Sequence, residues 1–213
     1  KAQAKKVPRA LIPRFVEPEL ATLDTEVPTG AGWLHEAKYD GYRIIARKAG
    51  DDVTLFSRSG LDWTVRFPAI AQALRTFPAE IALIDGEVAF VLPSGLTCFK
   101  SLQEHIDTPN PAIRYFVFDL LSLDGKDWRK TPLKQRRAQL AKLMTTRGVS
   151  PFLIYADYVE GSGPEFFAQA SAAGLEGIVS KRADRPYISG RGRDWLKIKS
   201  TRGEEFVIGG YSR

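Results

Sequence analysis

The chain has 213 residues, of which 44% are hydrophobic and 26% charged, and its net charge is +6. This length allows one large domain with a buried core, and no apolar run approaches the ~18 residues of a membrane-spanning helix. With one cysteine, Cys98, and two histidines, a disulfide framework is excluded and a structural zinc site lacks ligands. We expect Cys98 to be a small residue of the hydrophobic core. The low cysteine content favours a cytoplasmic protein, and we expect it to be a monomer.

Residues 1–30 are predicted to form an N-terminal arm. Pro8, Pro13, Pro18 and Pro28 interrupt any helix there, and the apolar residues are scattered. Several basic residues precede the first acid of the chain; they are Lys1, Lys5, Lys6, Arg9 and Arg14. This basic cluster is compatible with a solvated tail or with contacts to phosphate groups.

Residues 31–213 are predicted to form one domain that begins with extended segments. Strands are expected at 33–39, 42–48 and 53–57, joined by turns at Asp40-Gly41 and at 50–52, as an antiparallel meander. A helix is expected at 67–77, because Pro68 occupies its first turn and apolar residues recur on one face.

The second half of the chain alternates between strands and helices. Two strands are expected on either side of Asp85-Gly86, and residues 115–121 form a strand that is apolar on both faces. Helices are expected at 131–146 and from Ser162, with a capping box to Glu165, to Gly174. Strands follow at 177–181, 195–199 and 205–211. The prediction is an α+β fold with antiparallel sheets and flanking helices.

The segment His35–Arg43 (HEAKYDGYR) contains the first group of candidate site residues. Side chains alternate along a strand, so Glu36, Lys38 and Asp40 are expected to share one face. A lysine between fixed carboxylates is suited to act as an amine nucleophile. A solvated sheet edge would show the same alternation, so this pattern alone leaves both interpretations open.

A second strand, WLKIK at 195–199, places two lysines on one face and two apolar residues on the other. Lys197 and Lys199 repel each other unless an anion lies between them, and a triphosphate is such an anion. The surrounding segment is rich in cations, for which we favour phosphate contact: Lys181, Arg182, Arg185, Arg191, Arg193, Lys197, Lys199 and Arg202.

Two glutamates lie within apolar runs, where an isolated carboxylate is unfavourable unless it is paired or bound to a metal. These are Glu87, after Asp85-Gly86, and Glu176, before Gly177-Ile178-Val179. Because oxygen ligands without histidine or cysteine favour Mg²⁺ or Mn²⁺, both are candidate metal ligands. A salt bridge to an arginine is the alternative for each of them. Strand alternation puts Glu176 and Lys181 on opposite faces, so a bend near Gly177 is needed for both to reach one site.

These segments together resemble the motifs of covalent nucleotidyltransferases: ATP-dependent DNA ligases, RNA ligases and mRNA capping enzymes. Lys38-Tyr39-Asp40-Gly41-Tyr42-Arg43 is similar to their K-x-D-G-x-R signature. The further motifs follow in order as Ser57-Arg58-Ser59-Gly60, Asp85-Gly86-Glu87, the aromatic strand Tyr115–Leu121, Glu176–Lys181 and Trp195–Lys199. The resemblance covers residues 33–200 and implies an ATP-grasp-like nucleotidyltransferase domain.

The resemblance also implies roles for individual residues. Lys38 is the nucleophile that attacks the α-phosphate, and Asp40 and Arg43 complete the catalytic signature. Arg43 and Glu87 contact the ribose, Glu87 and Glu176 lie near the metal, and Phe118 stacks on the base, unless it is only a core aromatic. The remaining nucleotide-binding residues are Glu36, Ala37, Arg58, Lys181, Arg193, Lys197 and Lys199.

Glu36 bears on the choice of base. A carboxylate only accepts hydrogen bonds, which suits the 6-amino group of adenine and not the 6-oxo group of guanine. ATP is therefore predicted over GTP, and a DNA ligase over a capping guanylyltransferase. An RNA ligase and a noncatalytic nucleic-acid-binding domain of the same fold remain alternatives.

The segment from Pro18 to Glu36 is most similar to the ligase module of bacterial Ligase D, which repairs double-strand breaks by non-homologous end joining. That resemblance implies nicked or broken double-stranded DNA as substrate, Ku as a partner and a nucleoid-associated bacterial enzyme. In this family an OB-fold domain normally follows the adenylation domain. The sequence has no room for one, so we expect it to load AMP and to leave sealing to a longer protein.

Overall fold

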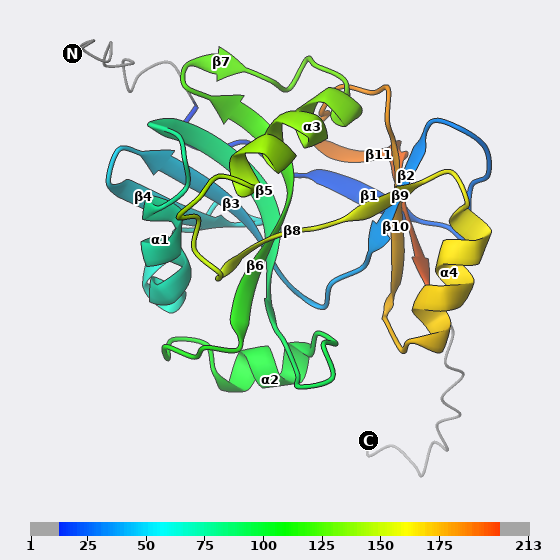
Figure 1. Cartoon of the computed structure of the whole chain (residues 1–213), viewed down its shortest axis with the longest axis horizontal. Helices are drawn as coiled ribbons and strands as arrows, with labels where there is room; N and C mark the ends of the chain where they lie inside the picture. The colour runs from blue at the N-terminus through cyan, green and yellow to red at the C-terminus, as the bar shows by residue number, and fades with distance from the viewer. Residues whose placement is uncertain (1–12, 201–213) are drawn as a thin grey trace, which may run out of the picture.

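The computed structural model of the chain describes residues 13–200 and contains two β-sheets that lie beside each other (Figure 1). Long runs rich in Val, Ile, Leu and Phe favour extended backbone and supply the central strands of both sheets. Most neighbouring strands are antiparallel, as predicted, and two pairs are parallel: β1 with β11, and β6 with β8.

The five-stranded sheet has the order β1-β11-β10-β2-β9. Its strands are β1 (Glu19–Leu23), β2 (Trp33–Ala37), β9 (Tyr158–Glu160), β10 (Gly177–Arg182) and β11 (Gly190–Lys199). The register places Val179 of β10 opposite both Glu36 and Lys197. Two segments that resemble nucleotidyltransferase motifs are thus brought next to the strand that leads to Lys38.

The six-stranded sheet has the order β4-β3-β5-β6-β7, with β8 paired to β6. Its strands are β3 (Gly41–Ala49), β4 (Asp52–Ser57), β5 (Ile81–Phe90), β6 (Ile113–Leu123), β7 (Lys126–Asp127) and β8 (Leu153–Tyr155). Arg43 of β3 lies opposite Glu87 of β5. The short loop from Lys38 to Asp40 joins the two sheets.

Four α-helices and a short 3-10 segment, Thr64–Arg66, surround the sheets within the described residues. Helix α1 (Pro68–Arg75) packs on β4, α2 (Phe99–Glu104) on β5, α3 (Leu133–Met144) on β6 and β8, and α4 (Gly163–Ala172) on β10 and β2. In Figure 1, α1 and α4 lie at opposite outer sides of the molecule. Buried Ile70, Ala73 and Leu74 confirm the predicted apolar face of α1.

Several expectations about elements were wrong. The predicted meander is divided, because β2 belongs to one sheet and the β3–β4 hairpin to the other. Asp85-Gly86 lies inside the continuous strand β5, because a β-bulge in the β5–β6 pairing accommodates it without a turn. Ser162 makes no side-chain capping hydrogen bond, and its backbone is left-handed (φ 36°) in place of the extended conformation typical of a capping residue.

The predicted arm, residues 1–30, also differs from expectation where the structure describes it. Glu19–Leu23 forms strand β1, held by parallel pairing with β11. Prolines exclude a helix there but permit an edge strand, which explains the difference. The predicted strand at 205–211, Arg202 and the basic residues up to Arg9 lie outside the described residues, and the division into arm and domain stays a prediction.

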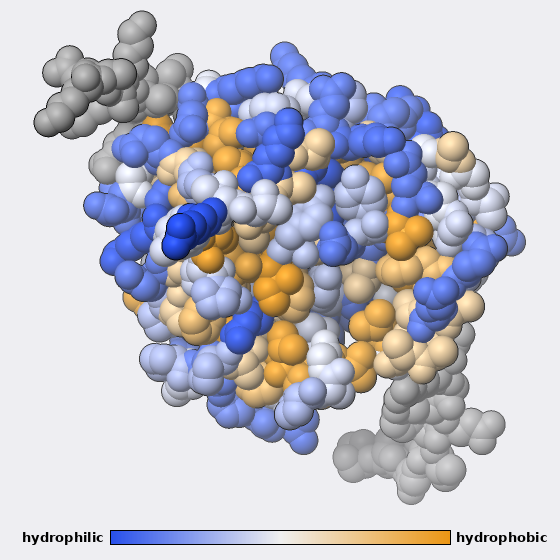
Figure 2. Space-filling view, in the orientation of Figure 1, coloured by the Kyte–Doolittle hydropathy of each residue, from blue (hydrophilic) through white to orange (hydrophobic). Residues whose placement is uncertain are grey.

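The hydrophobic core is largest beneath the six-stranded sheet, where α1 and α3 cover side chains of β3, β5 and β6. Figure 2 shows apolar side chains over the middle of the face seen in Figure 1, with hydrophilic ones around its edges. Among residues 13–200 no helix has the length and apolar character needed to cross a membrane.

Candidate active site

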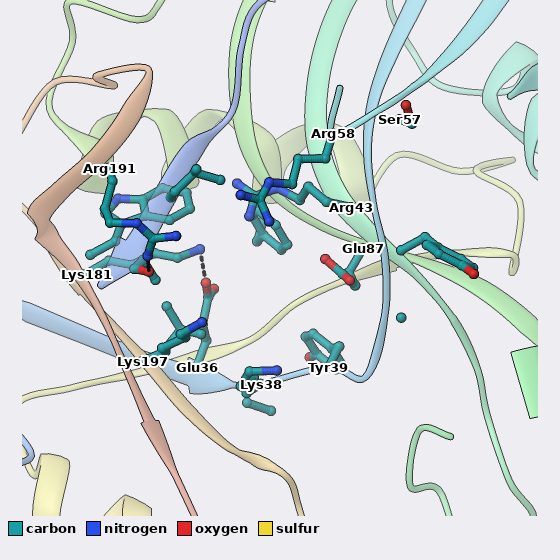
Figure 3. Close-up of a pocket in the computed structure, with 18 of the residues that line it drawn as sticks. Glu36, Lys38, Tyr39, Arg43, Ser57, Arg58, Glu87, Lys181, Arg191 and Lys197 are labelled. Atoms are coloured by element: carbon teal, nitrogen blue, oxygen red, sulfur yellow. Dashed lines mark hydrogen bonds and ion pairs between the residues drawn. The ribbon is translucent and has the colours of Figure 1, made fainter. Parts of the chain in front are cut away.

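A cavity of about 580 Å³ lies between the two sheets, and the motif residues converge on it (Figure 3). Charged side chains from both sheets line it: Glu36, Lys38, Lys181, Arg191 and Lys197 from the five-stranded side, and Arg43, Arg58 and Glu87 from the six-stranded side. Aromatic rings of Tyr39, Tyr42, Trp63, Phe118 and Trp195 complete its walls. A volume of this size is typical of a nucleotide-sized ligand site.

Lys38 is the first residue after β2, at the point where the chain crosses between the sheets. Its backbone N–H donates to the Gly177 carbonyl at 3.0 Å, and its ammonium pairs with the Glu176 carboxylate. Gly41 permits the crossing, because a Cβ there would overlap the Val88 carbonyl oxygen of β5. The nucleophile predicted from the sequence therefore lies in the cavity wall with its amine held by a carboxylate.

Asp40 does not share that wall with Glu36 and Lys38, contrary to strand alternation. Strand β2 ends at Ala37, so the alternation does not extend to Asp40. Its carboxylate accepts the Phe99 N–H at 3.0 Å, and its own N–H donates to Thr97 Oγ1 at 2.9 Å. Asp40 thus ties the crossing segment to the start of α2. Its assigned catalytic role stays a prediction, and its contacts are those of a positioning residue.

Arg43 enters the cavity from β3 and is fixed by a partner that sequence reasoning missed. Its Nε and Nη2 donate to the two carboxylate oxygens of Asp85 at 2.5 and 2.7 Å. The Tyr187 hydroxyl donates to the same carboxylate at 2.6 Å. Burial opposes the charged form of Arg43, but the neighbouring Asp85 raises the pKa of Arg43 above its usual value. Asp85 lies in an apolar run like Glu87, and that signal could have identified it.

Glu87 lies in the cavity wall next to Arg43, and its side chain forms no hydrogen bond or ion pair with residues 13–200. Burial raises the pKa of Glu87 to about 8, against the opposing effects of the Arg43 and Lys38 charges. An arginine salt bridge, the alternative interpretation, is therefore not formed. A carboxylate that lacks a counter-ion is suited to bind a cation.

Replacing Glu87 by Gln is expected to remove part of the pH dependence of stability. The folded protein keeps the Glu87 proton up to about pH 8, whereas the unfolded chain loses it near the ordinary glutamate pKa of 4.5. The unfolded state therefore binds fewer protons in this window, and the free energy of unfolding falls as pH rises through it. Because Glu87 is only half-buried in the cavity wall, we expect a fall of about 1–2 kcal/mol and not the full linkage value.

Urea unfolding of both proteins at pH 5, 6.5 and 8 measures this difference. Buried Glu19, whose pKa burial raises to about 7, contributes equally to both and cancels in the comparison. Identical pH profiles for the wild type and Glu87→Gln would contradict the assignment.

Glu36 is buried in the cavity wall and pairs with Lys181 through Oε1, as the dashed line in Figure 3 shows. Lys181 projects from β10 between two aromatic rings, with its ammonium 4.0 Å from the Phe118 centroid and 3.9 Å from that of Trp195. Ala37 lies beside Glu36 in the same wall. These residues were predicted from the sequence, and the structure brings them together.

The cations of the predicted phosphate site divide into two groups. Arg58 and Lys197 line the cavity. The pKa of Lys197 is lowered by burial and by the neighbouring cations Lys38, Arg191 and Lys199. Lys199 lies outside, 3.7 Å from Glu176, and Arg193 pairs with Asp24 on the surface. Arg191, which was not selected as a nucleotide-binding residue, lines the cavity instead.

Irregular pairing explains the difference between Arg191 and Arg193. The register of β1 against β11 shifts between Leu20 and Thr22, so that Leu20 faces Arg191 and Thr22 faces Leu196. A bulge of this kind redirects side chains that simple alternation places on one face.

Glu176 lies at the rim and not in the cavity wall, while Lys181, from the same motif, lies inside. Gly177, between them, has φ of 148°, and a Cβ there would overlap the Ile198 carbonyl oxygen. The two side chains therefore do not line one cavity, and Glu176 contacts the site only at its rim, through Lys38. Glu176 bridges Lys38 and Lys199 through its two oxygens.

Phe118 lines the cavity with 6% of its surface exposed. The Arg43 guanidinium carbon lies 4.6 Å from its ring centroid, and Trp195 packs edge-on against it at 6.1 Å. The ring is therefore both a core aromatic and part of the cavity surface, and stacking on a base stays a prediction.

A divalent cation fits the carboxylates of this cavity. Glu87 lacks a partner, and its carboxyl would be ionised by a nearby cation. Glu176, at the rim, is held by Lys38 and Lys199, so Glu87 is the carboxyl of the two that is open to a cation. Within residues 13–200 no cluster of three metal-ligating side chains exists, so phosphate oxygens or water must supply the other ligands.

Comparison with known proteins agrees with this geometry. Residues 19–199 match the family described as ATP dependent DNA ligase domain. The chain belongs to this family. The ligase domain is 36% identical over 202 residues to the multifunctional non-homologous end joining protein LigD of Pseudomonas aeruginosa, covering 94% of the chain and 24% of that protein. It is 33% identical to DNA ligase C1 of Mycolicibacterium smegmatis, covering 92% of the chain and 60% of that protein.

Solved structures show the same relationship. The ligase domain superimposes on a mycobacterial DNA ligase D complexed with ATP and MES with a TM-score of 0.74 and 33% identity, covering 85% of this chain and 59% of that one. The ligase domain of Mycobacterium tuberculosis LigD gives a TM-score of 0.73 with 32% identity, covering 85% and 60%. The chain therefore spans about a quarter of the LigD protein and about 60% of the ligase regions it matches.

Proposed function

We propose that this domain transfers AMP from ATP to Lys38 and that the AMP is later passed to a 5′-phosphate during DNA strand sealing. The observation that carries the proposal is the position of the Lys38 amine in a cavity whose walls combine aromatic rings with cations. Phe118 and Trp195 supply apolar surface for a base, and Arg58, Lys181, Arg191 and Lys197 supply charge for phosphates.

The proposed step is a displacement at phosphorus. The Lys38 amine forms a bond to the α-phosphorus of ATP, the bond to the oxygen bridging to the β-phosphate breaks, and pyrophosphate leaves. The attacking amine must first lose a proton, and Glu176 is in direct contact to accept it. A Mg²⁺ or Mn²⁺ ion held near Glu87 would neutralise charge on the phosphates. Lys197 and Arg191 would stabilise the negative charge of the departing pyrophosphate.

Intact-mass measurement after incubation with ATP and Mg²⁺ tests the proposal. We expect the wild type to gain one AMP-sized increment and Lys38→Arg to gain none. Arg keeps the positive charge opposite Glu176 but is not a usable nucleophile, so it is the matched variant. Lys142→Arg, on the exposed face of α3, is the control for lysine substitution and should be adenylated like the wild type.

Labelled ATP and GTP distinguish the alternatives. Retention of a GMP label would indicate a guanylyltransferase, and absence of any label on the protein would indicate a noncatalytic domain. Transfer of the AMP to a nicked DNA duplex, and not to nicked RNA, would separate a DNA ligase from an RNA ligase.

The proposal for the whole protein goes further. The matched LigD protein is much longer than this chain, so we propose that an OB-fold domain and other modules complete sealing, and that Ku delivers broken double-stranded DNA. Support comes from the names of relatives that act in non-homologous end joining. Ku-dependent stimulation of end joining by the longer protein is the corresponding test.

A further inference from the structure

Arg137 is a buried arginine that contacts the cavity residue Glu36 from the side facing away from the cavity. It lies on α3 with 1% of its side chain exposed, and it does not line the cavity. Its Nη2 donates to the Ala156 carbonyl, and its guanidinium carbon lies 4.4 Å from the ring centroid of Tyr155 and 5.1 Å from that of Tyr158. These contacts fix the guanidinium in one position.

The carboxylate within ion-pair distance of Arg137 is Glu36, and Asp119 also favours its charged form from farther away. Arg137 Nη1 lies 3.8 Å from Glu36 Oε2, while Lys181 pairs with Oε1 of the same carboxylate. Nη1 has no hydrogen-bond partner in the part of the chain that the structure describes. A small displacement of the carboxylate toward Arg137 would complete that hydrogen bond.

The two cations differ in their relation to a ligand. Lys181 lines the cavity, so a bound ligand would be able to compete with Glu36 for its ammonium. Arg137 lies outside the cavity wall and is out of reach of a ligand. Burial lowers the pKa of Arg137, but the ordinary value lies above about 12, so the guanidinium stays charged at neutral pH. Arg137 is thus the counter-charge that remains with Glu36 when the site is filled.

The charge of Glu36 determines which base it can bind. An ionised carboxylate only accepts hydrogen bonds and matches the 6-amino group of adenine, whereas a protonated carboxyl also donates and can bind a 6-oxo group. A carboxyl that is 4% exposed would be driven toward the protonated form without a nearby cation. We propose that Arg137 is a positioning residue for base selection, which holds Glu36 as an oriented carboxylate; this rests on the proposed transfer of AMP from ATP.

Other titratable groups around Glu36 do not take over this role. Burial raises the pKa of Tyr39 to about 12 and also raises the pKa of Tyr155, so neither ring supplies charge near Glu36 at neutral pH. The charged or titratable groups facing Glu36 from the surrounding elements are Lys181 on β10, Arg137 on α3, Lys197 on β11, Tyr158 on β9, Tyr155 on β8 and Tyr39 after β2.

The test compares ATP with inosine triphosphate, which carries a 6-oxo group without the 2-amino group of guanine. Single-turnover label transfer to Lys38 gives kcat/KM for each nucleotide in the wild type, Arg137→Met and Arg137→Lys. We expect Arg137→Met to lower the ATP-to-inosine-triphosphate ratio by about tenfold or more, mainly through KM for ATP. Arg137→Lys keeps the charge and should retain most of the ratio.

The pH profile separates base selection from a structural effect. In Arg137→Met the ratio should vary with pH and be lowest at acidic pH, because Glu36 has lost a counter-charge that favours its ionised form, whereas the wild-type ratio should stay flat. Arg129→Met, at an exposed position, is the control and should behave as wild type. Glu36→Gln should lower the ratio, and adding Arg137→Met to it should lower the ratio no further.

An equal loss with both nucleotides at every pH would overturn the inference, since it would show that Arg137 only supports the fold. If Arg137→Met does not fold, Arg137→Gln, which removes the charge but keeps a polar side chain, takes its place in the comparison with Glu36→Gln and their double variant: additive losses would contradict the coupling. Failure of the wild type to accept label from ATP would reject the proposed function itself. A labelled wild type with an unchanged ratio in Arg137→Met would reject only this inference.

Discussion

Asp119→Asn is expected to lower the free energy of unfolding by about 3–5 kcal/mol. Arg136 donates from Nε and Nη2 to the two oxygens of Asp119 at 2.7 and 2.8 Å, and both side chains are fully buried. The neutral asparagine side chain leaves the Arg136 guanidinium as an uncompensated buried charge. The NH₂ group of the asparagine also faces an N–H group of Arg136, so two donors oppose each other. Arg136 also donates to the Thr131 carbonyl at 2.6 Å, so the loss extends to the start of α3.

Urea unfolding at pH 7 measures the change, with Asp127→Asn as the matched control. Asp127 accepts from Arg129 with the same two-pronged geometry, at 3.0 and 2.8 Å, but both side chains are more than a third exposed. Solvent screening limits that pair to less than about 1 kcal/mol. Similar losses in the two variants would show that burial does not determine the contribution of the Arg136 pair.

The second large effect is expected on catalysis. Asp85→Asn should slow AMP transfer to Lys38 by about 100-fold at saturating ATP, because Arg43 loses the pair of hydrogen bonds to the Asp85 carboxylate that fixes it in the cavity. Arg43→Lys should give a similar loss, since an ammonium cannot occupy both carboxylate oxygens at once. Single-turnover transfer of labelled AMP measures the rate, and thermal unfolding of the same samples measures stability.

Asp184→Asn is the control for this experiment. Asp184 accepts from Nε and Nη2 of Arg182 at 3.1 and 3.2 Å, the same arrangement at an exposed position away from the cavity. It should leave AMP transfer within about twofold of the wild type, as expected for an exposed pair. Retention of full activity in folded Asp85→Asn would refute a positioning role for this carboxylate.

The sequence by itself determined the candidate nucleophile, whose role stays a prediction, and most of the residues that surround it in the structure. Lys38, Arg43, Glu87 and Lys181 belong to short motifs whose residue types and order are dictated by the chemistry, and the structure places all four around one cavity. Strands and helices with clear apolar periodicity, such as α1, were also predicted correctly. These features depend on residues close together in the chain, which is why local patterns were sufficient.

Only the tertiary structure decided which charged residues are buried and what they contact. Arg136 and Arg137 occupy a helix whose polar sequence suggests a solvated face, yet both side chains are buried. Arg136 is buried beside Asp119, which is 17 positions earlier in the chain, and Arg137 beside Glu36, which is 101 positions earlier. Asp40 turns away from the cavity because β2 ends before it, and Arg191 replaces Arg193 because the β1–β11 register shifts. Such pairings depend on the free energy of burying a charge beside a distant partner, and local periodicity contains no information about that partner.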